Sequence, residues 1–163
     1  MSQARKLEIA GILLMAVAIL AALSIITYNG SDYTTAKMIT AGDLFGGGET
    51  PARSIQNGLG LVGAYIAHFF VFILFGYISL IVPAIIAGYG WFVFRHKSVK
   101  PMIWPTVYGL WGMILISVII GWFYNQFAWF TPLWSGNTGL GTASLLQQIT
   151  GIGSIFILVV LLG

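Results

Sequence analysis

Residues 57–97 read NGLGLVGAYIAHFFVFILFGYISLIVPAIIAGYGWFVFRHK, and the rest of the chain can be placed relative to them. This segment holds no Asp, Glu, Lys or Arg before its last three residues. A membrane-spanning helix needs about 20 apolar residues, so the run is about twice as long as one crossing requires. Gly76 and Pro83 interrupt it. We therefore predict an amphipathic lead-in helix over residues 58–75, followed by a membrane span over residues 77–94.

The composition indicates a membrane protein. Of the 163 residues, 58% are hydrophobic and only 7% are charged, and the mean hydropathy is +0.94. Soluble domains carry about 25% charged residues, so a soluble protein of this size could not cover its surface with so few. The six Trp, seven Tyr and eleven Phe fit the aromatic belts of bilayer interfaces. The absence of cysteine excludes disulfides, thiolate catalysis and cysteine-ligated metal sites.

Three other apolar runs predict further spans over about residues 7–28, 106–127 and 144–163. The first run is longer than the apolar core of a signal peptide, about 7–15 residues, so we expect it to remain uncleaved. Residues 29–56 are rich in glycine and carry charges of both signs, which predicts an outer loop rather than a packed domain. The predicted fold class is all-α: one polytopic membrane domain, residues 1–163, with four transmembrane helices and two lead-in helices.

One pattern occurs twice, before the second and the fourth span. Gly139-Leu140-Gly141 echoes Gly58-Leu59-Gly60, and each precedes a half-helix, a glycine break and a strongly apolar run. The second copy predicts a lead-in helix over residues 139–150. Its apolar run is too short for a crossing of its own, so either the lead-in helix contributes or the chain is a fragment, which we favour. Because small residues let helices approach closely, packing roles are predicted for Gly58, Gly60, Gly63, Ala67, Gly76, Gly139, Gly141 and Gly151.

The distribution of basic residues predicts the orientation in the membrane. Cytoplasmic loops carry an excess of Lys and Arg. The residues that set the topology under this rule precede the first span or follow the second: Arg5, Lys6, Arg95, Lys97 and Lys100. Both termini are therefore predicted to be cytoplasmic, with both lead-in helices on the outer side.

Little in the sequence points to chemistry. Residues 58–63 match GxGxxG, but no strand precedes them and no acidic residue follows, so the glycines are interpreted as helix-packing residues. There is no P-loop motif. His68 is interpreted as an interfacial polar residue, with proton relay or ligand binding as the alternative, and His96 as part of the basic stop cluster. Of the four carboxylates, Glu8 lies in the first turn of the first span and none lies deeper inside a span, which weakens the case for ion-coupled transport.

We accordingly predict no catalytic, cofactor-binding or metal site, no cofactor, and no direct contact with nucleic acid. The uncharged aromatic segment from Trp122 to Trp134 is interpreted as an interfacial belt, with a partner-binding surface as the alternative.

Several motifs occur together in a recognisable order. They are RKLEIAG at residues 5–11, Thr27-Tyr28-Asn29 with Ser31-Asp32, and Asn57-x-Leu59-Gly60-x-x-Gly63-Ala64-x-x-Ala67 followed by Gly76. In this order the chain resembles, over essentially its whole length, the N-terminal four-span membrane domain of the FtsK/SpoIIIE family of bacterial DNA translocases. One departure is His68, where the family tends to have Asp.

The resemblance implies a parent protein anchored in the bacterial cytoplasmic (inner) membrane at the division septum. A linker would join it to a cytoplasmic, hexameric, ATP-driven motor that pumps chromosomal DNA during cell division and chromosome partition. The motor is absent from these residues, so this chain is not expected to be an enzyme. Its implied partners are the lipid bilayer, further copies of itself and other division proteins. The rival interpretation is a small channel or transporter subunit with paired broken helices.

Overall fold

The computed structural model describes residues 2–39 and 54–162, and within them it is helical without β-strands. The α-helices are α1 (Gln3–Ile26), α2 (Gly30–Met38), α4 (Gly60–Ala67), α5 (Ile81–Phe94), α6 (Ile103–Phe127), α7 (Gly136–Thr150) and α8 (Ser154–Leu162). A π-helix, η2 (His68–Leu74), continues α4, and 3-10 turns occur at η3 (Gly76–Leu80), η4 (Lys100–Met102), η5 (Pro132–Trp134) and η6 (Gly151–Gly153). The predicted all-α polytopic membrane class is confirmed.

Three helical segments are long and apolar enough to cross a membrane: Gln3–Ile26, Gly76–Phe94 and Lys100–Phe127. Pro83 does not interrupt the second of these, because it lies in the first turn of α5, where a missing backbone N–H costs little. The pair Gly136–Thr150 and Ser154–Val160 would form a fourth crossing only as one broken span, since its two helices meet at 119°. The fourth span therefore stays a prediction.

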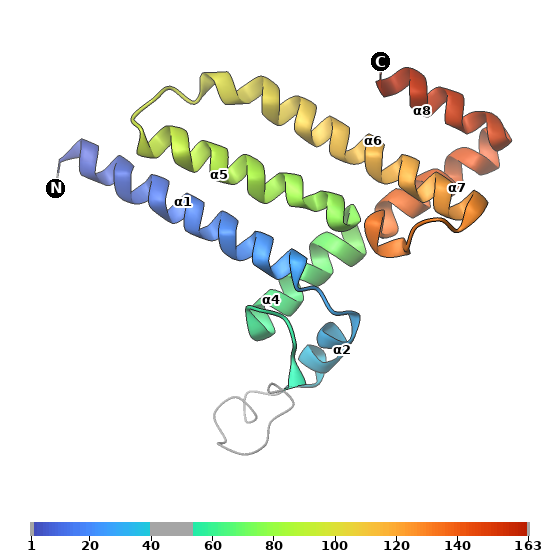
Figure 1. Cartoon of the computed structure of the whole chain (residues 1–163), viewed down its shortest axis with the longest axis horizontal. Helices are drawn as coiled ribbons and strands as arrows, with labels where there is room; N and C mark the ends of the chain where they lie inside the picture. The colour runs from blue at the N-terminus through green and yellow to red at the C-terminus, as the bar shows by residue number, and fades with distance from the viewer. Residues whose placement is uncertain (1, 40–53, 163) are drawn as a thin grey trace.

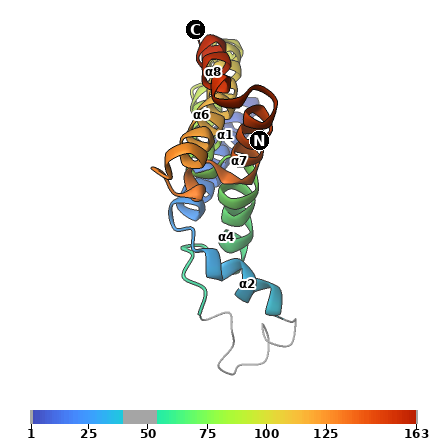
Figure 2. The same ribbon diagram turned by 90° about the vertical axis from the view of Figure 1, so that its right-hand side faces the viewer.

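The three long segments lie side by side in one layer. Figure 1 shows α5 between α1 and α6, and Figure 2 shows the layer nearly edge on. Because the layer is one helix thick, only 22%, 17% and 22% of the residues in the most apolar windows of the three spans are buried. Many of the remaining apolar side chains of α1 and α6 are exposed, as lipid-facing residues are, whereas most of those of α5, which lies between them, are partly buried.

The contact between α1 and α5 depends on close approach of the two backbones. A Cβ atom added to Gly11 would collide with the backbone of Gly90 and Phe94, and one added to Gly90 would collide with Gly11 and Met15. Glycine at both positions therefore lets the helices pack more closely than larger side chains would.

The prediction of a loop over residues 29–56 is wrong for residues 30–38, which form α2. The Asn29 side chain caps this helix by accepting a hydrogen bond from the Ser31 amide at 3.1 Å. Asp32 in the first turn and Lys37 in the last turn both interact favourably with the helix dipole. These local signals outweigh the glycine-rich, mixed-charge composition on which the loop prediction rested. Residues 40–53 of the predicted loop lie outside the described residues.

The two lead-in helices do not correspond in the way that the glycine motifs suggested. Gly60 begins α4 with a positive φ of 57°, whereas Gly139 and Gly141 lie inside α7. The residue that begins α7 with a positive φ, 65°, is Gly136. The second lead-in helix therefore starts at Gly136 rather than at residue 139, because backbone conformation, and not the short glycine motif, marks its first residue.

Candidate functional site

The first polar cluster lies where α1 ends and α4 begins, and it centres on Asn57. The Asn57 side-chain amide donates to the carbonyls of Ser24, at 2.9 Å, and Thr27, at 3.2 Å. Its Oδ1 atom accepts from the Leu59 amide at 3.1 Å. Asn57 is only 5% exposed, so one buried side chain satisfies the last carbonyls of α1 and the entry to the lead-in helix.

Asp32 joins α2 to the same point. Its two carboxylate oxygens accept from the backbone amides of Gln56, at 3.1 Å, and Asn57, at 2.8 Å, and the residue is 2% exposed. Hydrogen bonds to an ionised carboxylate are roughly twice as strong as those between neutral groups. We call Ser24, Thr27, Asp32 and Asn57 the polar clamp, because together they hold α1, α2 and α4.

The clamp also explains one of the predicted packing glycines. Ser24 Oγ donates to the carbonyl of Gly63 at 2.6 Å, and a Cβ atom on Gly63 would overlap the Asn57 side chain. The nearby Tyr28 is partly buried, and burial, with Tyr77 and Asp32 as neighbours, raises the pKa of its phenol. The phenol therefore stays neutral at physiological pH.

A second cluster joins α6 to the start of α7, and it consists of small residues. Ser117 Oγ donates to the carbonyl of Ser135 at 2.6 Å, and Ser135 Oγ donates to the carbonyl of Ser117 at 2.7 Å. A Cβ atom on Gly139 would collide with both serine side chains, and one on Gly121 would press on Gly139. The reciprocal bonds satisfy two buried hydroxyl groups within an apolar helix contact.

The first glycine break meets the start of the second lead-in helix beside this cluster. Gly76 has a φ of 68°, and a Cβ atom there would overlap the backbone of Leu133 and Trp134. A Cβ atom on Gly136 would overlap the backbone of Leu74 and Gly76. Both positions therefore require glycine for conformation and for space. We call Gly76, Gly136, Ser117 and Ser135 the helix junction.

Each break is followed by a buried serine three residues later. Ser79 Oγ donates to the carbonyl of Phe70 at 2.9 Å. Ser154 Oγ donates to the carbonyl of Gly151 at 2.8 Å and accepts from the indole N–H of Trp122 at 2.8 Å. The signal Gly-x-x-Ser is present in the sequence at residues 76–79 and 151–154, so the prediction from glycine repeats missed the polar half of the pattern.

The remaining predicted packing residues have different environments. Ala67 is fully buried, and a Cβ atom on Gly58 would lie 3.3 Å from Leu23 and Thr27 side-chain atoms. A Cβ atom on Gly60, Gly141 or Gly151 would meet no described atom within 4 Å. Gly60 and Gly151 have positive φ values of 57° and 62°, but Gly141 lies within α7. The structure thus supplies no close contact that would explain a packing role for Gly141.

Similarity to known proteins agrees with this geometry. The family model for the 4TM region of DNA translocase FtsK/SpoIIIE matches residues 3–163. The chain belongs to this family. It is also 34% identical over 100 residues to the DNA translocase FtsK of Chlorobaculum tepidum, a match that covers 61% of this chain and 12% of the relative. No solved structure matches.

Residues that carried the FtsK/SpoIIIE resemblance take part in the polar clamp. Asp32 ends one of the quoted motifs and Asn57 begins the next, and the carboxylate of Asp32 accepts a hydrogen bond from the backbone amide of Asn57. The motif spacing therefore encodes a contact between α2 and the lead-in helix. Neither residue was predicted as a site residue from its type alone.

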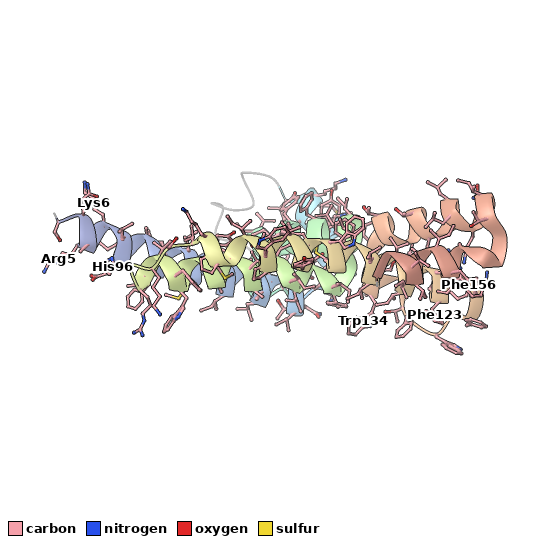
Figure 3. The ribbon with its side chains drawn as sticks, turned by 90° about the horizontal axis from the view of Figure 1, so that it is seen from above. Arg5, Lys6, His96, Phe123, Trp134 and Phe156 are labelled. Carbon is pink, nitrogen blue, oxygen red and sulfur yellow. The ribbon has the colours of Figure 1, made fainter. Side chains whose placement is uncertain are left out.

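Basic residues of this FtsK/SpoIIIE domain that precede the first span or follow the second lie towards one end of the helix layer, whereas Lys37 lies on α2. Figure 3 shows Arg5, Lys6 and His96 at that end, and Phe123, Trp134 and Phe156 towards the other. His96 pairs with Glu8 of α1 at 3.2 Å. The predicted topology residues Arg95 and Lys97 flank His96 in the chain, and Lys100 begins η4. Which side of the membrane this end faces is a prediction from the positive-inside rule.

Within residues 2–39 and 54–162, no group of three or more His, Cys, Asp or Glu side chains could hold a metal ion. The described clusters contain serine hydroxyls, an amide and a carboxylate that bind backbone groups of the same chain. Such an arrangement positions helices, and its chemistry is structural.

Proposed function

We propose that this chain is the membrane-anchoring and septum-localising domain of a DNA translocase that acts in cell division and chromosome segregation. The observation that carries the proposal is the match of residues 3–163 to the 4TM region of the FtsK/SpoIIIE family. The chain corresponds to 12% of the curated relative. In this proposal an ATP-driven motor lies elsewhere in the parent protein, and this chain itself is not an enzyme.

The anchoring role is supported by three segments that are able to span a membrane, and by the polar clamp and the helix junction that connect them. We place the domain in the bacterial inner membrane because of the family match, and both termini in the cytoplasm because Arg5, Lys6 and His96 lie towards one end of the layer. The one-helix-thick layer supports assembly with further copies, for which the family implies a hexamer, and with other division proteins.

A fusion of this chain to a fluorescent protein tests the proposal in dividing bacterial cells. We expect fluorescence to gather at midcell. The Gly63→Leu variant, which forces a side chain into the polar clamp, should lower the midcell fraction. Gly141→Leu is the matched control, since its side chain would enter open space. Uniform envelope fluorescence of the unaltered fusion would refute the division role and would favour a channel or transporter subunit.

Orientation is tested by labelling with a membrane-impermeant maleimide. The chain has no cysteine, so a single cysteine at position 97 reports that site alone. We expect no labelling from outside intact cells and full labelling after the membrane is opened. Labelling from outside would show that the proposed orientation is inverted.

A further inference from the structure

His68 joins α2 to the first lead-in helix through a stack of aromatic rings. Its imidazole lies parallel to the Tyr33 ring of α2, with centroids 3.5 Å apart and an interplanar angle of 3°. Phe72 stacks on the same imidazole at 4.8 Å. Tyr65 packs edge-on against Tyr33, and its hydroxyl donates to the carbonyl of Ala36 at 3.4 Å. Figure 1 shows α2 beside α4, which lies against the end of α1.

The environment of His68 favours a neutral ring. Its Nδ1 atom is buried and has no hydrogen-bond partner. In a neutral imidazole with its proton on Nε2, the Nδ1 atom carries a lone pair and no proton. Protonation would place an N–H group there without an acceptor, and a buried unsatisfied donor is costly.

The charged and titratable groups around the ring also disfavour protonation. Lys37 of α2 lies over the Tyr33 ring, with Nζ 4.9 Å from the ring centroid. The α2 carboxylate, Asp32, accepts hydrogen bonds from the Gln56 and Asn57 amides in the polar clamp. Burial, and then the charge of Lys37, lowers the pKa of His68.

The other elements packed against η2 bring few titratable groups. The lead-in helix α4 contributes Tyr65, and η3 contributes Tyr77. Helix α7 and turn η5 contain no titratable residue. The charged residues of α1 all lie between Arg5 and Glu8, near the opposite end of that helix from its contact with α4. Among the described residues, the carboxylates on these elements are therefore Glu8, near the far end of α1, and Asp32, whose hydrogen bonds direct it to the clamp.

We infer that His68 is a pH-sensitive latch that holds α2 on the lead-in helix while neutral and loosens it when protonated. His68 is the first residue of a π-helical segment, and although π-helices are rare, they often occur at functional sites. Helix α2 is the element released, and the polar clamp limits its movement at its first turn. The inference does not depend on the division role, because it concerns only contacts within the chain.

The direction of the pH effect follows from the two states of the ring. A free histidine has a pKa of about 6.5, and the docked ring has a lower pKa. The released state therefore binds the proton more readily than the docked state. The contribution of His68 to holding α2 on the lead-in helix is greatest above about pH 6.5. It decreases as the pH falls towards the pKa of the docked ring, and below that pKa it stays constant.

The latch is tested on the full chain in lipid nanodiscs. The His96→Gln background leaves His68 as the only histidine, so NMR of its imidazole follows one titration. Hydrogen exchange of the α2 amides, corrected for intrinsic rates, is measured between pH 7.5 and pH 5.5. We expect His68 to titrate below the free value, and the protection of α2 to fall several-fold over the same range. Amides around Gly11 serve as the internal reference and should keep their protection.

Two variants separate the latch from other effects of pH. His68→Phe retains an aromatic ring that cannot be protonated, so the pH dependence of α2 protection should disappear. Lys37→Gln removes the neighbouring charge and should raise the pKa of His68 towards the free value, so the fall in protection should end at a higher pH and be smaller. An equal fall in His68→Phe, a His68 pKa at or above the free value, or α2 protection that is constant across the titration would each overturn the inference.

Discussion

Replacing Asn57 by alanine should weaken the joint between α1 and the first lead-in helix more than most surface changes could. The side chain makes three hydrogen bonds, to the carbonyls of Ser24 and Thr27 and from the amide of Leu59. A protein hydrogen bond contributes about 1 kcal/mol net, and those between membrane helices average about 0.6 kcal/mol. The expected loss in the free energy of unfolding is therefore about 2–3 kcal/mol.

This loss can be measured by titrating the chain with a denaturing detergent in mixed micelles while following tryptophan fluorescence. Asn137→Ala is the matched control, because Asn137 is exposed on α7 and such changes alter stability by no more than about 0.5 kcal/mol. Hydrogen exchange should also increase in α2, since loss of the side-chain bonds leaves position 57, whose backbone amide donates to Asp32, less firmly held. If the two alanine variants unfold with equal free energies, Asn57 does not hold this joint, and the reasoning from its hydrogen bonds is refuted.

Three further predictions concern other parts of the fold. Gly76→Ala should destabilise the domain by more than about 2 kcal/mol, because the φ of residue 76 is 68° and the added Cβ would overlap backbone atoms. Gly141→Ala, whose Cβ would meet no described atom, should be neutral or stabilising by up to about 1 kcal/mol. The same detergent titration compares them, and equal effects would contradict the glycine argument. Trp122→Phe should lower the free energy of unfolding by about 1 kcal/mol and increase amide exchange at the start of α8, since it removes the indole N–H that donates to Ser154. Unchanged exchange there would show that this hydrogen bond does not stabilise α8. Replacing the three basic residues of the 95–100 loop by glutamine should produce mixed orientations, whereas a fusion-reporter map identical to that of the unaltered chain would exclude this role.

Much of the fold could be predicted from sequence because the solvent imposes it. An uncharged apolar segment of about 20 residues has few alternatives to a membrane helix, since backbone groups in lipid must be satisfied within the helix itself. The overlong run from Asn57 to Lys97 divides at Gly76, the first residue of η3, where the structure has a positive φ. The family could also be predicted from sequence, because its motifs are short and their order along the chain is distinctive.

The candidate site could not be predicted in this way, because its contacts join segments far apart in the chain. The Asp32 carboxylate accepts from the amide of Asn57, 25 residues later, and the Asn57 side chain donates to the carbonyl of Ser24, 33 residues earlier. Nothing in a single sequence states which carbonyls the chain will bring within reach of a given side chain. Helix α2 was missed for a more local reason, since the loop prediction rested on the glycine-rich composition and did not weigh the Asn29 cap, which the structure shows to be decisive.

The sequence by itself determined that this is a helical membrane domain, where its apolar segments lie and which family it resembles, since apolar length and motif order are local properties. The tertiary structure alone decided that Gly136, and not Gly139, begins the second lead-in helix, and that it meets the break at Gly76. The physical reason is that a positive φ and a backbone-to-backbone contact depend on where the returning chain passes. A glycine in a sequence shows only that such an approach is permitted.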